Sequence, residues 1–215
     1  MNLVKRILRP TVVDSTQLTY QQIILVIIGI AFVIRVAVIL FHFSLWYPWM
    51  GDSNYYIQIA RDPRVLGIPA APLAPVKTVG PIYPTFLIPF FYASPSTLEA
   101  LTSRVIAVRL VQLLMDTWIT CMMVQIAWRL FGERVALITT VVQAFDLRYI
   151  FISATISTET LFIALFVTAL WALLKAQSEA GYPWYRISGG ILGLAVLTRP
   201  IPILFPLLLI AVLLP

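Results

Sequence analysis

The stretch "IILVIIGIAFVIRVAVILFHF", residues 23–43, decides the fold class of this chain. As an α-helix rising about 1.5 Å per residue it reaches roughly 31 Å, which is enough to cross the hydrocarbon core of a bilayer. It is too long for a removable signal peptide, and no small-residue cleavage site accompanies it. The sequence therefore predicts a first membrane-spanning helix at residues 23–43.

The composition of the whole chain agrees with a protein whose solvent is the bilayer. Of the 215 residues, 60% are hydrophobic and 11% are charged, and the mean hydropathy is +0.94, far outside the usage of soluble globular proteins. The formal net charge is +6, but the cations flank apolar runs and form no basic stripe with interleaved aromatic residues. We therefore expect membrane lipids and phosphate-bearing substrates as partners, and no nucleic acid.

Further apolar runs predict a single all-α polytopic membrane domain, residues 1–215, with about five to six transmembrane helices. We expect a cytoplasmic amphipathic N-terminus (1–22), the first span (23–43), an extracytoplasmic loop bearing short interfacial helices (44–102) and the remaining spans (103–215). Lys and Arg are more numerous at the expected cytoplasmic positions 5, 6, 9, 129, 134, 175 and 186 than at the outer positions 61, 64, 77, 104 and 148. This modest excess favours a plasma-membrane protein with its N-terminus in the cytoplasm and its active side outside.

The extracytoplasmic loop contains two segments that predict short helices. The segment "DSNYYIQIAR", residues 52–61, is expected to begin at Asp52 as N-cap and to carry Tyr56, Ile59 and Ala60 on one face. A proline-rich stretch follows, and then "IYPTFLIPFFYA", residues 82–93, which is apolar but too short to span. We expect this last segment to be interfacial or re-entrant.

The later spans are expected at about residues 103–128, 135–144 and 156–174, followed by an apolar run at residues 187–214. The sequence "TRPIP" interrupts that last run, which predicts either one long kinked helix or two short helices around a break. Gly189 and Gly193 form a GxxxG motif, which we interpret as a site of close helix packing rather than of dimerisation.

Several ionisable residues fall at the expected outer half of the membrane although they come from separate segments: Asp52, Lys77, Arg148, Glu159 and Arg199. A charged side chain within a span costs roughly 2.5 to 3.5 kcal/mol on insertion scales, so such groups should face a cavity or one another. Together they predict an acidic and basic pocket that is open to the outside.

A second polar set lies within the spans. Arg109, Gln112 and Asp116 are spaced i, i+3 and i+7, so they share one helix face and predict a structural polar seam with internal pairing. Arg35, in the first span, is expected to snorkel or to be paired near the outer interface.

The sequence identifies no cofactor. The single histidine, His42, closes an apolar run and has no second metal ligand near it, which favours interfacial packing. The single cysteine, Cys121, lies inside another apolar run, so the sequence predicts no disulfide framework. A divalent ion beside Asp52 is an alternative that the sequence leaves open.

Motifs in a fixed order carry a resemblance to a known family. They are "GDSNYY" (51–56), "VKTVGPIYP" (76–84), "RLFGERVAL" (129–137), "ATISTETLFIALFVTALWALL" (154–174) and "GGILGLAVLTRP" (189–200). Their order and spacing resemble the membrane glycosyltransferases of the GT-C superfamily. The nearest branch contains the protein O-mannosyltransferases and the bacterial enzyme that moves aminoarabinose onto lipid A. The resemblance extends from about Leu25 onward and matches the N-terminal half of these enzymes.

The resemblance implies transfer of a sugar from a polyprenyl-phosphate donor to an extracytoplasmic lipid, glycan or protein acceptor. Asp52 matches the family's catalytic carboxylate in the first loop and would act as general base, with Ser53 where many relatives carry a second acid. Tyr55 stands where the aminoarabinose enzyme has an arginine. The remaining expected site residues are Lys77, Arg199 and Arg148 as phosphate-binding cations and Glu159 as a supporting acid.

These residue types suit that chemistry. The acceptor hydroxyl needs a base, and the departing phosphate, which develops negative charge, needs cations. A phosphate leaving group needs no general acid, so one carboxylate suffices. A single direct displacement would invert the anomeric carbon.

Other interpretations stay open. On local sequence, Asp52 is also explained as a simple helix N-cap, and Lys77 as an ordinary loop cation. Members of the superfamily have more helices, so we expect a truncated or split product that is inactive alone or is completed by a second membrane chain. The alternative function is a non-catalytic membrane subunit or lipid-phosphate binder that retains the scaffold. A transporter is less favoured because we find no internal repeat.

Overall fold

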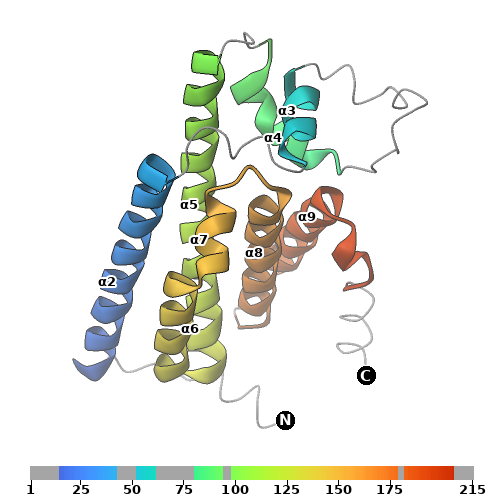
Figure 1. Ribbon diagram of the computed structural model, residues 1–215. Helices are drawn as coiled ribbons and strands as arrows, with labels where there is room; N and C mark the ends of the chain where they lie inside the picture. Colours follow the sequence, from blue (N-terminus) through green and yellow to red (C-terminus); the bar gives the residue numbers. More distant parts are fainter. Residues whose placement is uncertain (1–14, 43–51, 62–79, 94–97, 179–181, 206–215) are drawn as a thin grey trace.

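The computed structural model describes residues 15–42, 52–61, 80–93, 98–178 and 182–205, and Figure 1 shows their arrangement. In these ranges all regular secondary structure is helical, and no strand occurs. The all-α class expected from the sequence is therefore confirmed.

Three of these helices are long and apolar enough to cross a membrane: α2 (Ser15–Ala37), α5 (Leu98–Phe131) and α8 (Thr158–Ser178). α2 continues into a short π-helix, η1 (Val38–His42), so the first span lies close to its predicted range. Shorter segments run alongside, namely α6 (Glu133–Phe145) with α7 (Leu147–Ser153), and α9 (Tyr182–Thr198) (Figure 1). The helices fit an integral membrane protein, while the count of five to six spans stays a prediction.

Large apolar side chains stand exposed on the outward faces of the bundle. Leu25 and Val33 of α2 are 67% and 65% exposed, and Ile138 of α6 is 61% exposed. Burying an aliphatic side chain is worth about 1.5–3 kcal/mol in water, so an extended face of this kind is unfavourable in water and suits a lipid environment.

The segment predicted at about residues 135–144 is helix α6 (Glu133–Phe145), and a second helix, α7, begins directly after it. The Asp146 N–H donates to Val142 O at 2.9 Å, which closes α6. The Asp146 carboxylate then accepts the backbone N–H of Arg148 at 2.9 Å, as the N-cap of α7. An aspartate at this position satisfies a donor that the first turn of a helix leaves unpaired. α7 therefore continues the helical path to Ser153 before the chain turns into α8.

α3 (Ser53–Arg61) and α4 (Ile82–Phe91) lie together at one end of the bundle, which we call the α3–α4 end (Figure 1). The apolar side chains of their shared core are each 2% exposed or less: Ile57, Tyr83, Leu87 and Phe91. α3 begins directly after Asp52, which confirms the predicted short helix. α4 has 10 residues, so it is too short to span, as expected.

α9 ends at Thr198, and a short 3-10 helix, η4 (Ile201–Leu204), follows Pro200. Proline has no N–H to continue the helical hydrogen bonds, and it disfavours the α conformation in the residue before it. Up to residue 205, where the description ends, the last apolar run therefore contains a break rather than one continuous helix.

The GxxxG motif of α9 is not a packing site among the described residues. A Cβ atom added at Gly189 or Gly193 would meet no other atom within 4 Å. α9 instead contacts α8 through Ser188, whose hydroxyl donates to Ala169 O at 2.8 Å. The prediction of close packing at this motif is wrong here, because the buried face of α9 is a different one.

A buried ion pair joins helices in the interior of the bundle. Arg35 Nε of α2 lies 2.6 Å from Asp116 Oδ2 of α5, and the two side chains are 3% and 5% exposed. The Arg35 guanidinium also donates to two carbonyls in the last turn of α6, Gln143 O at 2.7 Å and Ala144 O at 3.2 Å. Arg35 is thus paired and does not snorkel, and Asp116 pairs with α2 rather than within its own helix.

Candidate functional site

The α3–α4 end carries an ion pair that two antiparallel helices bring together. Glu159 lies in the first turn of α8, and Arg199 directly follows the last residue of α9. Arg199 Nη2 donates to Glu159 Oε1 at 2.6 Å, and the side chains are 33% and 34% exposed, respectively. The pair is therefore partly accessible to a ligand.

Hydroxyl groups anchor α3 next to this pair. Ser53 Oγ donates to Ile156 O at 2.8 Å, in the turn before α8. The Thr158 side chain hydrogen-bonds with Tyr56, and its hydroxyl donates to Glu159 Oε2 at 3.4 Å. These contacts hold the start of α3 beside the start of α8.

Tyr56 lies among three charged side chains. Its pKa is raised above the ordinary value, first by burial and then by the negative charge of Asp52. The Thr158 hydrogen bond and the positive charge of Arg199 act in the opposite direction, while Glu159 raises the pKa further. Tyr56 is thus a neutral phenol at physiological pH and can both donate and accept a hydrogen bond.

Tyr83 of α4 supports Tyr56 from the apolar side. The two rings meet edge to face, with centroids 5.1 Å apart and planes at 82°, a favourable aromatic geometry. Tyr83 is fully buried, and burial raises its pKa well above the ordinary value, with smaller effects of Glu159 and Tyr56 in the same direction. α4 therefore forms the apolar wall of the site.

Several buried polar atoms next to the ion pair have no hydrogen-bond partner within the described part of the chain. They are Tyr83 Oη, Gln112 Oε1, Ser157 Oγ and Thr160 Oγ1. The Gln112 amide donates to Ser157 O at 3.2 Å, which links this group to the turn before α8. Because buried polar atoms in proteins are nearly always satisfied, these atoms have capacity for water or for ligand hydroxyl groups.

Gly80 explains how the chain entering α4 reaches the end of α9. A Cβ atom at Gly80 would lie against the carbonyl oxygens of Leu197 and Thr198, and 2.8 Å from the Thr198 carbonyl carbon. Only glycine permits this close backbone approach. The contact places the loop segment directly beside the residue that precedes Arg199.

The structure brings Asp52, Glu159 and Arg199 together around Tyr56, as the sequence predicted for these three. Asp52 is exposed, and its carbonyl accepts the Tyr56 N–H at 3.1 Å in the first turn of α3. Lys77 lies outside the described residues. In the ranges that the structure describes, no group of three or more His, Cys, Asp and Glu side chains could hold a metal ion.

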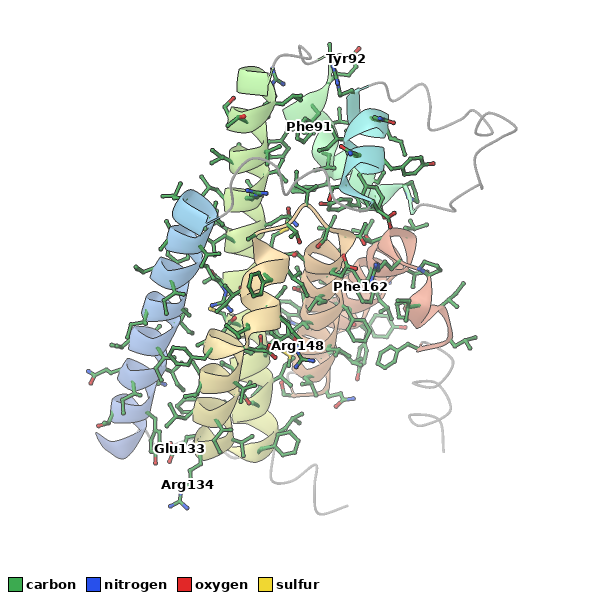
Figure 2. All side chains as sticks on the ribbon, viewed as in Figure 1. Phe91, Tyr92, Glu133, Arg134, Arg148 and Phe162 are labelled. Carbon is green, nitrogen blue, oxygen red and sulfur yellow. The ribbon has the colours of Figure 1, made fainter. Side chains whose placement is uncertain are left out.

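Arg148 does not join this group, which corrects the expectation of a shared pocket. Its Nη2 lies 2.8 Å from Asp146 Oδ2, and its side chain is 85% exposed. Figure 2 places Arg148 farther from the α3–α4 end than Phe162. The reason is the restart of the helix at Asp146, which puts Arg148 at the beginning of α7 rather than at the end of the crossing.

The sequence interpretation missed Tyr56 as the centre of the site. Tyr56 follows Asp52 by four residues, and residues at this spacing lie on the same face of a helix, so a signal was present. Thr158 and Gly80 offered no such signal, because their contacts join segments that are far apart in the sequence.

The chain matches the model of a known family. The profile of the family described as dolichyl-phosphate-mannose-protein mannosyltransferase matches residues 86–215, which is more than half of the chain. The chain belongs to this family. No curated protein and no solved structure matches it. Membership in the mannosyltransferase family confirms the resemblance and identifies a membrane glycosyltransferase of mannosyltransferase-like type.

The range matched by the mannosyltransferase family contains part of the site. Glu159 and Arg199 lie inside it, whereas Asp52 and Tyr56 precede it. The family implies a polyprenol-phosphate sugar donor and an acceptor at the membrane. A cation and a carboxylate at one end of an apolar bundle are the groups that such a transfer requires.

Proposed function

We propose that this protein transfers a sugar from a polyprenyl-phosphate donor to an extracytoplasmic lipid, glycan or protein acceptor, with Asp52 as general base. Family membership supports the class of reaction. The observation that carries the site is the partly exposed Glu159–Arg199 pair beside Tyr56, whose pKa responds to Asp52 as well as to both members of the pair.

Arg199 is the proposed ligand of the donor phosphate. A guanidinium presents several donors in a planar fork that matches phosphate oxygens. Glu159 holds one Nη2 group at 2.6 Å and thereby orients the fork before the substrate arrives. Lys77 is proposed as a second cation for the same phosphate.

Asp52 is the proposed base for the acceptor hydroxyl. Its position before the first turn of α3 is exposed, so an acceptor can approach from water. The proton passes from the acceptor oxygen to the carboxylate while that oxygen forms the new bond to the anomeric carbon, and the phosphate departs with the bonding electrons. The buried polar atoms around Gln112, Ser157 and Thr160 would serve the sugar hydroxyl groups, or water that bridges to them.

The test compares two carboxylate variants in membranes that contain the full chain. Asp52→Asn should lower transfer of mannose from polyprenyl-phosphate mannose by about 10² to 10⁴-fold, the usual contribution of a general base. Asp146→Asn is the matched control, because Asp146 also begins a helix but pairs with Arg148 outside the site. Binding of the donor should persist in both variants.

Transfer by Asp52→Asn at the normal rate would remove Asp52 as the base. Absence of transfer by the unaltered chain with any donor, together with stable co-purification with another membrane protein, would favour the non-catalytic subunit instead.

A further inference from the structure

Residues of α2 and α5 line a groove. They belong to the first part of α2 and the last turns of α5, which lie at the end of the bundle opposite to the α3–α4 end (Figure 1). The volume of the groove is about 440 Å³, within the range of about 300–1,000 Å³ that is usual for small-molecule sites. It is open to one side, and no residue of the candidate site lines it. The groove is therefore separate from the candidate site.

The apolar part of the groove comes from both helices. Ile24 and Ile28 of α2 face Val124 of α5, and Cys121 lies about one turn before Val124 on α5. Ile24 and Val124 are each 5% exposed and belong to the packed core, so neighbouring side chains hold the apolar surface of the groove in place. It offers an apolar channel along the helix axes.

Most polar residues of the groove lie toward one end. α2 contributes Gln21, near its beginning, and α5 contributes Trp128 and Arg129, near its end, with Gln125 about one turn before them. Because the two helices run in opposite directions, each of them separately places its polar side chains at the same end. This agreement gives the groove a polar end and an apolar channel in the order that a phospholipid has.

The polar end of the groove offers a cation and hydrogen-bond donors to an anion. Arg129 is exposed, and its guanidinium reaches Ser178 only through a long hydrogen bond of 3.5 Å. The Gln125 carbonyl accepts from Trp171 Nε1 at 2.9 Å, which orients the amide and leaves its NH2 group as a donor. Tryptophan, here Trp128, is typical of the membrane interface.

We propose that this groove binds an anionic glycerophospholipid from the leaflet at that end of the bundle. The phosphate contacts Arg129, with Gln21 and Gln125 as donors, and one acyl chain follows Ile24, Ile28 and Val124. Arg129 selects an anionic over a zwitterionic headgroup because none of the described residues that line the groove carries a carboxylate. The site is distinct from the proposed donor site, which lies at the other end of the bundle.

The experiment uses the fluorescence of Trp128 as a local probe. The full chain is reconstituted in phosphatidylcholine vesicles in which part of the lipid is brominated phosphatidylglycerol or, in parallel, brominated phosphatidylcholine. Bromine quenches tryptophan at short range, and Trp128→Phe identifies the part of the signal that belongs to Trp128. We expect stronger quenching of Trp128 by the anionic lipid at equal bromine content.

Two variants and one control connect the quenching to the groove. Arg129→Gln should lower the preference for the anionic lipid about fivefold, as expected for loss of one cation near a membrane surface. Cys121→Phe, which fills the apolar channel, should lower quenching by both lipids. Arg134→Gln removes an exposed cation at the same end of the bundle (Figure 2) that does not line the groove, so it should change neither value.

Equal quenching by the two lipids, or an unchanged preference in Arg129→Gln, would overturn the proposal. Relief of the quenching by added polyprenyl phosphate would overturn it as well, because the groove would then belong to the donor. The readout does not involve sugar transfer, so failure here is distinguishable from failure of the proposed function.

Discussion

Asp116→Asn is expected to destabilise the bundle far more than its small change in shape suggests. It removes the negative charge that lies 2.6 Å from Arg35 Nε and leaves a guanidinium whose side chain is 3% exposed. Removing one partner of a buried ion pair costs about 3–5 kcal/mol. Because Arg35 keeps its hydrogen bonds to the Gln143 and Ala144 carbonyls, we expect the lower end of this range, about 3 kcal/mol.

The measurement is thermal unfolding of the purified protein in detergent micelles, followed by tryptophan fluorescence. A loss of about 3 kcal/mol corresponds to a midpoint about 6–12 °C lower for a chain of this length. Asp146→Asn, which removes the charge of a carboxylate whose partner Arg148 is 85% exposed, is the matched control and should leave the midpoint unchanged. The double variant Arg35→Met/Asp116→Leu should recover most of the loss, since no charge then stays buried. Equal midpoints for Asp116→Asn and Asp146→Asn would refute the reasoning.

Three further substitutions test the site and its support. Arg199→Gln should lower sugar transfer by about 10² to 10³-fold, as for loss of one group that stabilises developing charge. Arg148→Gln should transfer sugar at the normal rate. Equal transfer rates for the two variants would exclude Arg199 as the phosphate ligand. Gly80→Ala should lower the free energy of unfolding by about 1–3 kcal/mol, because its methyl group meets the carbonyls at the end of α9. The added methyl group of Gly189→Ala meets no atom within 4 Å, so this control should be neutral or stabilising. A lower unfolding midpoint for Gly189→Ala than for Gly80→Ala would contradict the close approach of Gly80 to α9. Tyr83→Phe should be neutral at pH 7, since the Tyr83 hydroxyl has no hydrogen-bond partner among the described residues. Above about pH 10 the unaltered protein should lose stability more steeply than this variant, because the tyrosine of the unfolded chain ionises there while the buried one, with its raised pKa, keeps its proton. Identical pH profiles of the unfolding midpoint would show that Tyr83 is not buried as described.

Long apolar segments were predictable because hydropathy is a local property. The first span was expected at residues 23–43, and the apolar helix extends over Thr19–Leu40; the fourth was expected at about 156–174, and α8 covers Thr158–Ser178. The start of α3 after Asp52 was predictable for the same reason, since an N-cap followed by an amphipathic pattern lies within a few residues of sequence.

Pairing between helices was not predictable from spacing. The i, i+3, i+7 pattern of Arg109, Gln112 and Asp116 indicated a shared face of α5, but not that Arg35 of α2 lies against it. The exposed position of the GxxxG motif was likewise not predictable from its spacing, because small residues permit close packing without specifying a partner. The position of Arg148 was predicted wrongly because a single aspartate, Asp146, starts a new helix directly after α6.

The sequence was sufficient for the membrane class, for the family and for the charged residues whose presence among apolar segments demanded a reason. It was not sufficient for their grouping. Asp52, Glu159 and Arg199 meet around Tyr56, and Arg148 does not, because of the direction and offset of α3, α8 and α9. Transfer free energy belongs to a single segment and can be summed along it. An ion pair of 2.6 Å depends on two helix ends that are 40 positions apart in the chain, and that distance is set by packing.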